Sequence, residues 1–433
     1  MKKTVSVLLA LPLMLVLAAC SRAKPKTVNL WYHSADPVTD AYFEGKFAEL
    51  NASQNDYNFV YTSFAFADFQ EKFQMAVMTD NMPDVVSLGF SNIATFTAQN
   101  TLLPLNDLVD RMDNYQYIDE NLMANLISLG NGTIYGLPYA YNQEVAWYNT
   151  VKFAEMGIKA APATQSEFLA LCEKYANKGK GTYFASLRGV RPYDSLLAWL
   201  FTYTDGCGYN GSWFNKEGKC ILSDDRFVEA LNVYADIYKK GWVSSDSVNN
   251  NYAEIVAEFG SGVSMYIVHN SSSESTHRKN LGEGNFASAR VLANAAGHYY
   301  ASGLQPNVYC IAKNKNPKHD YTGAVKLIDW MLSAEIDGGL CEKVGRVPCN
   351  TQIVEQDWYK NNVNMMLYAD YLTDKNYMQI LNPYWLSDFS TMITTDMTAD
   401  FQAVLLGDMT AKDCCAKWAK QIDEYQAEYL ASL

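Results

Sequence analysis

The 433-residue chain is predicted to be an α/β protein of two lobes, each a mostly parallel sheet flanked by helices, joined by hinge crossings. Apolar segments alternate between strand and helix patterns before residue 131, and a second alternating series begins after residue 149. The stretch between them is NGTIYGLPYAYNQEVAWYN, in which Gly136 and Pro138 interrupt a short hairpin and lead into a strand over 145–148. A crossing between two alternating units is typical of a hinge.

The first twenty residues have the pattern of a targeting segment. Lys2 and Lys3 precede an apolar run over 5–19, which ends in L-A-A-C. This ending resembles a lipobox, in which Cys20 is lipidated, and an ordinary secretory signal is the alternative. We therefore expect a signal peptide over 1–19 and a lipidated tether over 20–26. No later run approaches the ~20 apolar residues that a membrane span needs, so the lipid is the expected membrane contact.

The composition favours a small amphipathic ligand over a nucleic acid. Without Lys2 and Lys3 the chain has 32 basic and 47 acidic residues, a net charge of −15. Nucleic acids select basic surfaces, so this balance argues against them. The chain also contains 30 Tyr, 19 Phe and 9 Trp. Tyr and Trp combine an apolar face with a polar edge, which suits sugars, although most of these rings are expected in cores.

The cysteines and histidines give little support for a metal site. Eight cysteines follow Cys20, and their spacing is not that of a small disulfide scaffold. The pairs Cys207–Cys220 and Cys341–Cys349 flank loops and could form bridges. The sequence contains no C-x-x-C or H-E-x-x-H pattern, so we expect neither a metal nor a cofactor.

The first unit has a β-α-β-α-β pattern. Strands are expected over 27–32, 57–62 and 83–88, and helices over 41–50, 69–77 and 93–98. Such units form parallel sheets, and their ligands lie beyond the carboxyl ends of the strands. The candidate ligand contacts at these ends are Tyr32, His33, Phe66, Phe90 and Ser91.

The second unit begins with a capping box at 164–167, which opens a helix over 165–175. Strands are then expected over 182–187 and 263–269, with helices over 193–203, 224–240 and 252–259. A return strand over 299–311 and a helix over 324–331 lead back to the first unit. We therefore assign lobe 1 to 27–138 plus 304–344, and lobe 2 to 139–303 plus 345–433.

Several short motifs occur in an order that resembles a known family. They are D-F-x-x-K-F at 68–73, P-D-V at 83–85, G-L-P at 136–138, W-Y-N at 147–149 and G-R-V-P at 345–348. Together they resemble the extracellular solute-binding proteins of sugar-type ABC importers, the maltose-binding-protein-like family. The resemblance implies a periplasmic-binding-protein fold, a monomer, a sugar ligand, ABC permease subunits as partners and an extracytoplasmic location.

The resemblance also implies ligand contacts at the crossings. Asn142 stands where these relatives have a polar ligand contact, beside Tyr141. Arg191 and Tyr193 match a polar-Pro-Tyr motif, although Arg191 replaces an acidic residue. The family often has a tryptophan where this chain has His269 and Asn270, so Trp385 is the candidate stacking residue, with a core position as its alternative. The complete candidate set is Tyr32, His33, Phe66, Phe90, Ser91, Tyr141, Asn142, Arg191, Tyr193, His269, Asn270, Gly303, Arg346 and Trp385.

The expected function is capture of an oligosaccharide or polyol by closure of the lobes, followed by delivery to an ABC permease. No G-x-S-x-G elbow or Walker-type phosphate-binding loop is present to indicate an enzyme. Two alternatives remain. A receptor for a phosphorylated polyol or sugar acid would use Arg191 and Arg346 as charge partners. A surface glycan-active enzyme would use a carboxylate pair, which 47 acidic residues always permit.

Overall fold

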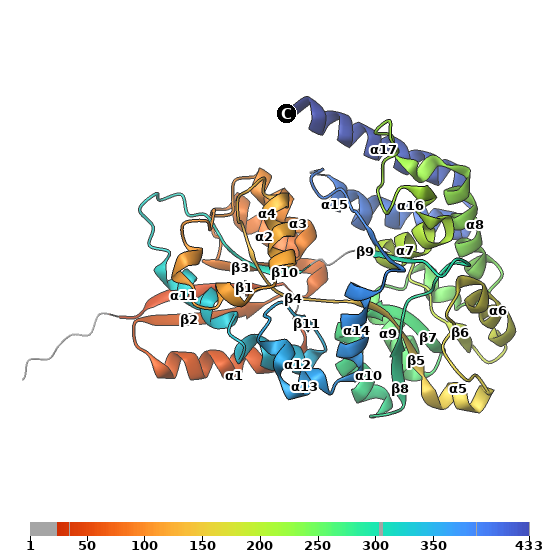
Figure 1. Cartoon of the computed structure of the whole chain (residues 1–433), viewed down its shortest axis with the longest axis horizontal. Coiled ribbons are helices and arrows are strands. Elements are labelled where there is room, and N and C mark those ends of the chain that lie inside the picture. The colour runs from red at the N-terminus through yellow and green to blue at the C-terminus, as the bar shows by residue number, and fades with distance from the viewer. Residues whose placement is uncertain (1–23, 34, 303–305, 387, 433) are drawn as a thin grey trace, which may run out of the picture.

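A computed structural model describes residues 24–33, 35–302, 306–386 and 388–432. The molecule has two lobes side by side, each built around its own sheet (Figure 1). The two-lobe α/β architecture is therefore as predicted. The predicted signal peptide, Cys20 and Gly303 lie outside the described residues.

Lobe 1 contains a six-stranded sheet in the order β11-β4-β10-β3-β1-β2. Its strands are β1 (Lys26–Tyr32), β2 (Tyr57–Ser63), β3 (Val85–Leu88), β4 (Leu137–Tyr141), β10 (Asn307–Ile311) and β11 (Val347–Pro348). β1 is parallel to β2 and β3, whereas β10 is antiparallel to β3 and β4. The sheet is mixed, not mostly parallel, because the chain returning from lobe 2 enters it in the opposite direction.

Helices cover both faces of this sheet. They are α1 (Pro37–Ser53), α2 (Phe66–Met78), α3 (Phe90–Ala98), α4 (Glu120–Leu129), α11 (Thr322–Met331) and α12 (Ile336–Val344). α2, α3 and α4 lie on one side and α1 and α12 on the other (Figure 1). α1 begins where the Asp36 side chain accepts hydrogen bonds from the amides of Val38 and Thr39, and it buries Phe43 and Phe47 on one face.

Lobe 2 contains a four-stranded sheet in the order β6-β7-β5-β8 and a separate strand pair, β12-β9. The strands are β5 (Glu144–Asn149), β6 (Tyr183–Ala185), β7 (Ser264–Asn270), β8 (Phe286–Ala289), β9 (Tyr299–Ser302) and β12 (Tyr377–Ile380). β6 and β7 are parallel, but β5 is antiparallel to both of its neighbours. This sheet is mixed as well, because β5 continues directly from the crossing out of lobe 1.

Most of the remaining helices surround the lobe 2 sheet (Figure 1). The remaining helices are α5 (Thr150–Met156), α6 (Gln165–Tyr175), α7 (Tyr193–Thr204), α8 (Asp225–Lys239), α9 (Tyr252–Ser261), α10 (Glu274–Leu281), α13 (Asp357–Lys360), α14 (Val363–Thr373), α15 (Phe389–Thr391), α16 (Met397–Leu406) and α17 (Ala411–Ser432). Of these, α13 lies beside α12 (Figure 1). Thr164 caps α6 as predicted, by accepting a hydrogen bond from the Glu167 amide.

The predicted hairpin around Gly136 does not form. Pro138 instead lies inside β4, opposite Val308 of β10. A proline has no N–H to donate, so it fits only where no neighbouring strand requires one. On the other side of β4, β11 pairs only with Ala140 and Tyr141, and Pro138 is therefore tolerated.

The first crossing passes through Asn142 and Gln143, between β4 and β5. Gln143 is held by Ser271 of lobe 2, whose amide donates to the Gln143 carbonyl at 2.8 Å and whose hydroxyl accepts from the Gln143 amide at 3.2 Å. The last crossing comes later than the predicted boundary at residue 345. β11 joins the lobe 1 sheet, and the Asp119 amide donates to the Cys349 carbonyl at 2.9 Å, because the exposed edge of β4 can accept one more strand.

Each lobe has its own apolar core, and a third cluster connects them. The third cluster joins Tyr141 and Val347 at the ends of lobe 1 strands to Trp147 and Ile267 in the lobe 2 sheet. Because buried apolar groups resist separation, this packing holds the crossings of the two lobes together.

The two suggested disulfides are not formed. All eight cysteines among the described residues are free thiols, including Cys207, Cys220, Cys341 and Cys349. Burial raises the pKa of Cys220 to about 12, so this thiol stays protonated at neutral pH.

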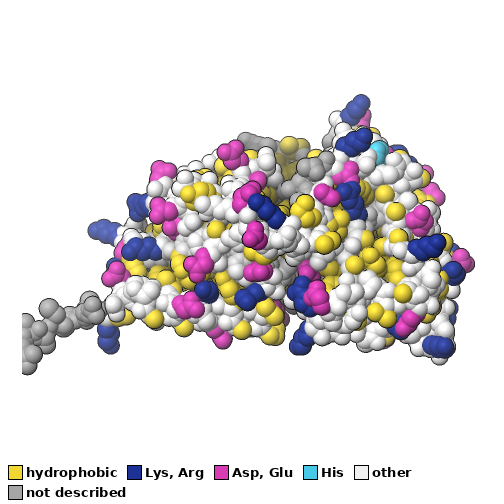
Figure 2. Space-filling view, turned by 60° about the horizontal axis from the view of Figure 1, so that its bottom comes forward, with side chains coloured by type: hydrophobic (Ala, Val, Ile, Leu, Met, Phe, Trp, Pro, Cys, Tyr) yellow, Lys and Arg dark blue, Asp and Glu magenta, His cyan; other side chains and the backbone are white. Residues whose placement is uncertain are grey.

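Acidic and basic side chains are interspersed over one face of both lobes (Figure 2). Opposite charges on the surface also pair directly, such as Lys46 with Glu335 at 3.1 Å. This face therefore presents no continuous basic field of the kind that a nucleic acid backbone requires. Within the described ranges, no helix combines the length and the apolar character needed to span a membrane.

Candidate functional site

Three contacts join the loops at the strand ends of lobe 1 to lobe 2. The guanidinium carbon of Arg191 lies 5.9 Å from the centroid of the Phe66 ring. The Ser390 hydroxyl donates to the Ser91 carbonyl at 2.5 Å. The rings of Phe90 and Tyr384 meet edge to face, with centroids 5.6 Å apart. Phe66, Phe90 and Ser91 thus all face lobe 2. They follow the carboxyl ends of lobe 1 strands, where ligands of α/β proteins bind.

His33 follows the carboxyl end of β1 and is buried. One ring nitrogen is hydrogen-bonded to the Ser87 hydroxyl, and the other lies 3.2 Å from the Asn307 side-chain oxygen. Burial lowers the pKa of His33 to about 3, so the ring is neutral at physiological pH. Its ring also contacts that of Phe66, with centroids 6.1 Å apart, and it therefore supports the lobe 1 side of the interlobe contact.

Tyr32 and Arg346 form a buried pair inside lobe 1. The Tyr32 hydroxyl accepts hydrogen bonds from the Arg346 guanidinium and from the Tyr139 hydroxyl, the latter at 3.2 Å. Both Tyr32 and Arg346 are almost completely inaccessible to solvent. Because their polar groups meet each other, these two predicted site residues connect β1 to the start of β11 and do not line an open surface.

Five residues form what we call the polar cluster: Glu144, Arg188, Asp194, Tyr252 and His269. They lie at the end of the lobe 2 sheet where β7 ends and β5 begins. The Arg188 guanidinium lies 3.8 Å above the Tyr252 ring and 3.6 Å from the Asp194 carboxylate. The Tyr252 hydroxyl donates to Asp194, and its ring meets the His269 ring edge to face at 5.4 Å. Glu144 interacts electrostatically with Arg188 and Asp194.

Several buried polar atoms of this cluster have no hydrogen-bond partner in the described chain. They are both carboxyl oxygens of Glu144, all three guanidinium nitrogens of Arg188 and Nε2 of His269. Burial and the nearby Asp194 carboxylate raise the pKa of Glu144 to about 8, and burial raises that of Asp194. Since buried polar groups in proteins are nearly always hydrogen-bonded, this arrangement indicates that a ligand or ordered water completes it.

The elements around the cluster place its members at one end of the sheet. Arg188 follows β6, His269 lies near the end of β7, and Glu144 begins β5, which runs in the opposite direction. Asp194 lies in the first turn of α7, and Tyr252 begins α9 directly after a capping box. A Cβ added to Gly189, next to Arg188, would lie 2.2 Å from the Val248 carbonyl oxygen, so the loop requires glycine there.

Among the predicted ligand contacts, Asn142 and Tyr193 lie near the polar cluster. Tyr141 and Asn270, by contrast, have structural roles. The Oδ1 atom of Asn142 is buried at the first crossing and has no hydrogen-bond partner among the described residues. Tyr193 begins α7, next to Asp194, and burial raises its pKa. Tyr141 packs in the third apolar cluster. Asn270 caps a short turn by accepting from the Ser272 amide and hydroxyl.

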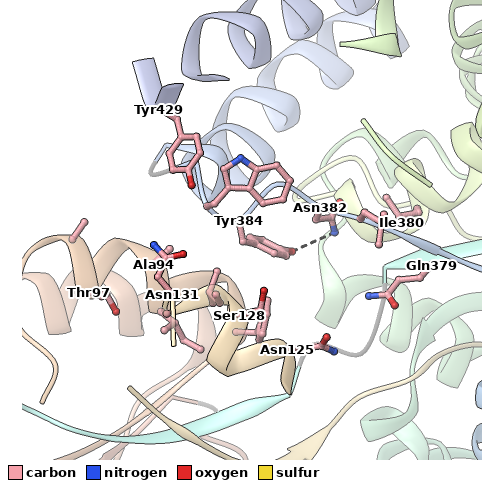
Figure 3. A pocket seen from close by; sticks show the side chains of 17 residues that line it. Ala94, Thr97, Asn125, Ser128, Asn131, Gln379, Ile380, Asn382, Tyr384 and Tyr429 are labelled. Carbon is pink, nitrogen blue, oxygen red and sulfur yellow. Dashed lines mark hydrogen bonds between the residues drawn. The ribbon is translucent and has the colours of Figure 1, made fainter. Parts of the chain in front are cut away.

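Trp385 and Phe90 line a separate space that we call the interlobe pocket, with a volume of about 620 Å³. Its lining comprises Phe90, Ile93, Ala94, Thr97, Ala98, Asn125, Ser128, Leu129, Gly130, Asn131, Gln379, Ile380, Leu381, Asn382, Tyr384, Trp385 and Tyr429. Side chains of α3 and α4 face the 379–385 segment across it (Figure 3). None of the polar cluster lines this pocket, which extends along α3 away from the strand ends.

Sequence reasoning missed four of the five cluster members: Glu144, Arg188, Asp194 and Tyr252. All four nevertheless lie at an end of a predicted element. Glu144 precedes the 145–148 strand and Arg188 follows the 182–187 strand, whereas Asp194 and Tyr252 lie in the first turns of predicted helices. A search of both ends of every predicted strand would have included Glu144 and Arg188. The signal was incomplete because the antiparallel direction of β5 brings its first residue, not its last, to the site.

Two facing lobes with hinge crossings between them, and buried polar groups at the opposing strand ends, define a two-lobe binding protein. The sequence profile of the bacterial extracellular solute-binding proteins matches residues 46–366. The chain belongs to this family.

Similar proteins agree with this assignment at low sequence identity. A Brucella abortus protein named only as a binding protein is 21% identical over 414 residues, which cover 93% of this chain and 95% of that one. The fold also matches a Thermotoga lettingae ABC transporter solute-binding protein bound with α-D-tagatose, with TM-score 0.79, 17% identity and coverage of 92% and 99%. The GacH receptor of Streptomyces glaucescens, solved with acarbose, matches with TM-score 0.78, 18% identity and coverage of 93% and 99%.

Proposed function

We propose that this protein captures a neutral sugar or polyol between its lobes and delivers it to an ABC permease. The observation that carries the proposal is the set of buried, unpartnered polar atoms at the strand ends of lobe 2, next to the Arg191–Phe66 contact between the lobes. Hydroxyl groups both donate and accept, so a sugar can satisfy the Arg188 donors and the Asn142 acceptor together. The tagatose- and acarbose-bound proteins of the same fold support this ligand class.

The charges of the polar cluster favour a neutral ligand. The Arg188 guanidinium is already paired with the Asp194 carboxylate at 3.6 Å. The pKa of Glu144 is about 8, so this carboxyl group is mostly protonated at neutral pH. It can therefore donate a hydrogen bond as well as accept one. A buried cluster without net charge binds a neutral ligand without leaving an unpaired ion behind.

Capture proceeds by closure of the lobes about the crossings. A ligand that touches both lobes favours the closed arrangement by its difference in affinity for the two states. The closed form, held at the membrane by a lipid on Cys20, then docks as a monomer on the permease.

A thermal-shift screen of the mature protein tests this function. The screen contains neutral sugars and polyols in one arm and sugar acids and phosphorylated polyols in the other. A neutral ligand at 100 times its Kd is expected to add about 2.7 kcal/mol of stability. If no compound in either arm stabilises the protein, the proposal is contradicted.

A receptor for an anionic sugar is the second candidate, and one observation favours it. Arg191 has no carboxylate partner within 4.0 Å among the described residues, although it lies at the contact between the lobes. An anionic ligand would meet that charge. Stabilisation only by the anionic arm of the screen would select this candidate over the neutral one.

A further inference from the structure

The interlobe pocket has the chemistry of a second ligand site. None of its lining residues is charged, and Asn125, Asn131, Gln379 and Asn382 supply side-chain amides. The side chains of Asn125, Asn131 and Gln379 are exposed, and none of them makes a hydrogen bond within the described chain. Amides both donate and accept, which fits a neutral ligand rich in hydroxyl groups.

The apolar part of the lining is aromatic. Trp385 is 41% exposed, and its ring nitrogen is directed to Gln426 at 3.3 Å. Tyr384, Phe90 and Tyr429 complete the aromatic side of the pocket (Figure 3). An exposed indole beside amides recognises a molecule with an apolar face and polar edges, such as a sugar ring.

One buried atom also lacks a partner here. The Thr97 hydroxyl of α3 is inaccessible to solvent and makes no hydrogen bond in the described chain. The pocket volume of about 620 Å³ falls within the range of about 300–1,000 Å³ that is typical of small-molecule sites.

We propose that the interlobe pocket is a second site, which binds a neutral saccharide at a place separate from the strand-end site. Because lobe 1 supplies Asn125 and lobe 2 supplies Gln379, an occupant contacts both lobes. It therefore favours the arrangement in which this pocket is open and Arg191 lies over Phe66. If the proposed function is correct, linkage requires occupancy of either site to raise the affinity of the other.

The test uses ¹⁹F NMR of the mature protein labelled with 5-fluorotryptophan. A Trp385→Phe variant identifies the Trp385 resonance. The probes are maltose, D-tagatose and ribitol, with glucuronate as an anionic comparison. At least one neutral probe is expected to shift this resonance in a saturable way, and glucuronate is not. No saturable shift from any neutral probe overturns the second site.

Two variants locate the binding event. The double variant Asn125→Leu/Gln379→Leu is expected to weaken the probe that shifts Trp385 about fivefold or more, because both amides lose their hydrogen bonds. Asn361→Leu, an exposed amide outside the pocket, serves as the matched control and is expected to change nothing. Equal affinity in the double variant and the control overturns the proposal.

A third variant separates this proposal from the proposed function. With Arg191→Ala, which removes the contact at the strand ends, the Trp385 shift is expected to persist. Its disappearance would mean that the tryptophan reports only lobe closure, and the second site would be wrong while the strand-end site remained. A shift that persists while no probe binds the strand ends would instead leave the second site and contradict the proposed function.

Discussion

Arg191 of lobe 2 lies over the ring of Phe66 of lobe 1, with 5.9 Å between the guanidinium carbon and the ring centroid. Phe66 is 45% exposed, so the contact is solvated, and cation–π pairs of this kind contribute about 0.5–1 kcal/mol. The two residues belong to different lobes and meet only when the lobes are together. Under the proposed function, the contact therefore stabilises the closed arrangement and, with it, ligand binding.

Removing either partner of this contact is expected to weaken sugar binding about two- to fivefold. Phe66→Ala and Arg191→Met, singly and together, form a double-mutant cycle read by calorimetric titration. The double variant is expected to lose less than the sum of the single losses. Met78→Ala, an exposed change at the far end of α2, is the control. Strictly additive losses would exclude a functional contact between the two side chains.

Asn142→Ala is expected to lower sugar affinity by about 1–3 kcal/mol, because the ligand hydroxyl that meets its buried amide loses a partner. The apo protein should melt at nearly the same temperature, since Oδ1 has no partner within the described protein. Calorimetric titration and apo melting curves check the two parts. Unchanged affinity would remove Asn142 from the site, and a collapsed melting temperature would make its role structural.

Arg188→Met is expected to destabilise the apo protein by about 3–5 kcal/mol at neutral pH, because the Asp194 carboxylate stays buried without its cation. Urea denaturation measures this loss. Lys46→Met breaks exposed pairs with Glu49 and Glu335 and is expected to cost less than about 1 kcal/mol. If the two variants lost equal stability, the polar cluster could not be the buried ionic site described.

Glu144 gives the apo protein a pH dependence of known sign. Its pKa is about 4.5 when unfolded and about 8 when folded, so the folded state holds a proton that the unfolded state releases in between. Stability from this group is therefore complete below pH 4.5 and falls as the pH rises towards 8, by up to about 1.4 kcal/mol per pH unit. Apo melting temperatures of the wild type should fall more steeply over this range than those of Glu144→Gln. Parallel curves would contradict the raised pKa.

Cys20→Ser is expected to abolish lipid labelling of the full chain and to release the protein from the membrane fraction. The reason is that the acyl chains on this residue supply the proposed anchor. Fractionation after metabolic lipid labelling measures both effects. A variant that stays in the membrane fraction after a high-salt wash would rule out the lipobox interpretation.

The sequence predicted best what depends on local pattern. The apolar spacing of Phe43 and Phe47 predicted α1, and the capping residue Thr164 marked the start of α6. Phe66 was predicted from its place in the loop after the 57–62 strand and Arg191 from the family resemblance, and the structure brings these two side chains together. The predicted hairpin at Gly136 was wrong because β11 does not reach Pro138, so that side of β4 needs no N–H there and the strand continues through the proline.

The polar cluster could not be assembled from local pattern. Its members lie between residues 144 and 269 and meet only after β5 has paired antiparallel to β7. Tyr32 and Arg346, each predicted as a ligand contact, are hydrogen-bonded to each other inside lobe 1. That pairing depends on β11 joining the lobe 1 sheet. A strand of two residues is too short to give a recognisable sequence pattern, so this pairing could not be predicted.

A crystal structure of the mature protein with the neutral sugar found in the screen tests the central claim most directly. We expect the sugar between the lobes, hydrogen-bonded to Asn142 and to the polar cluster. Arg191 and Phe66 should lie on either side of the opening through which the sugar reaches solvent. A sugar bound only outside the strand-end region, with the Arg188 and Glu144 atoms still lacking partners, would contradict the claim.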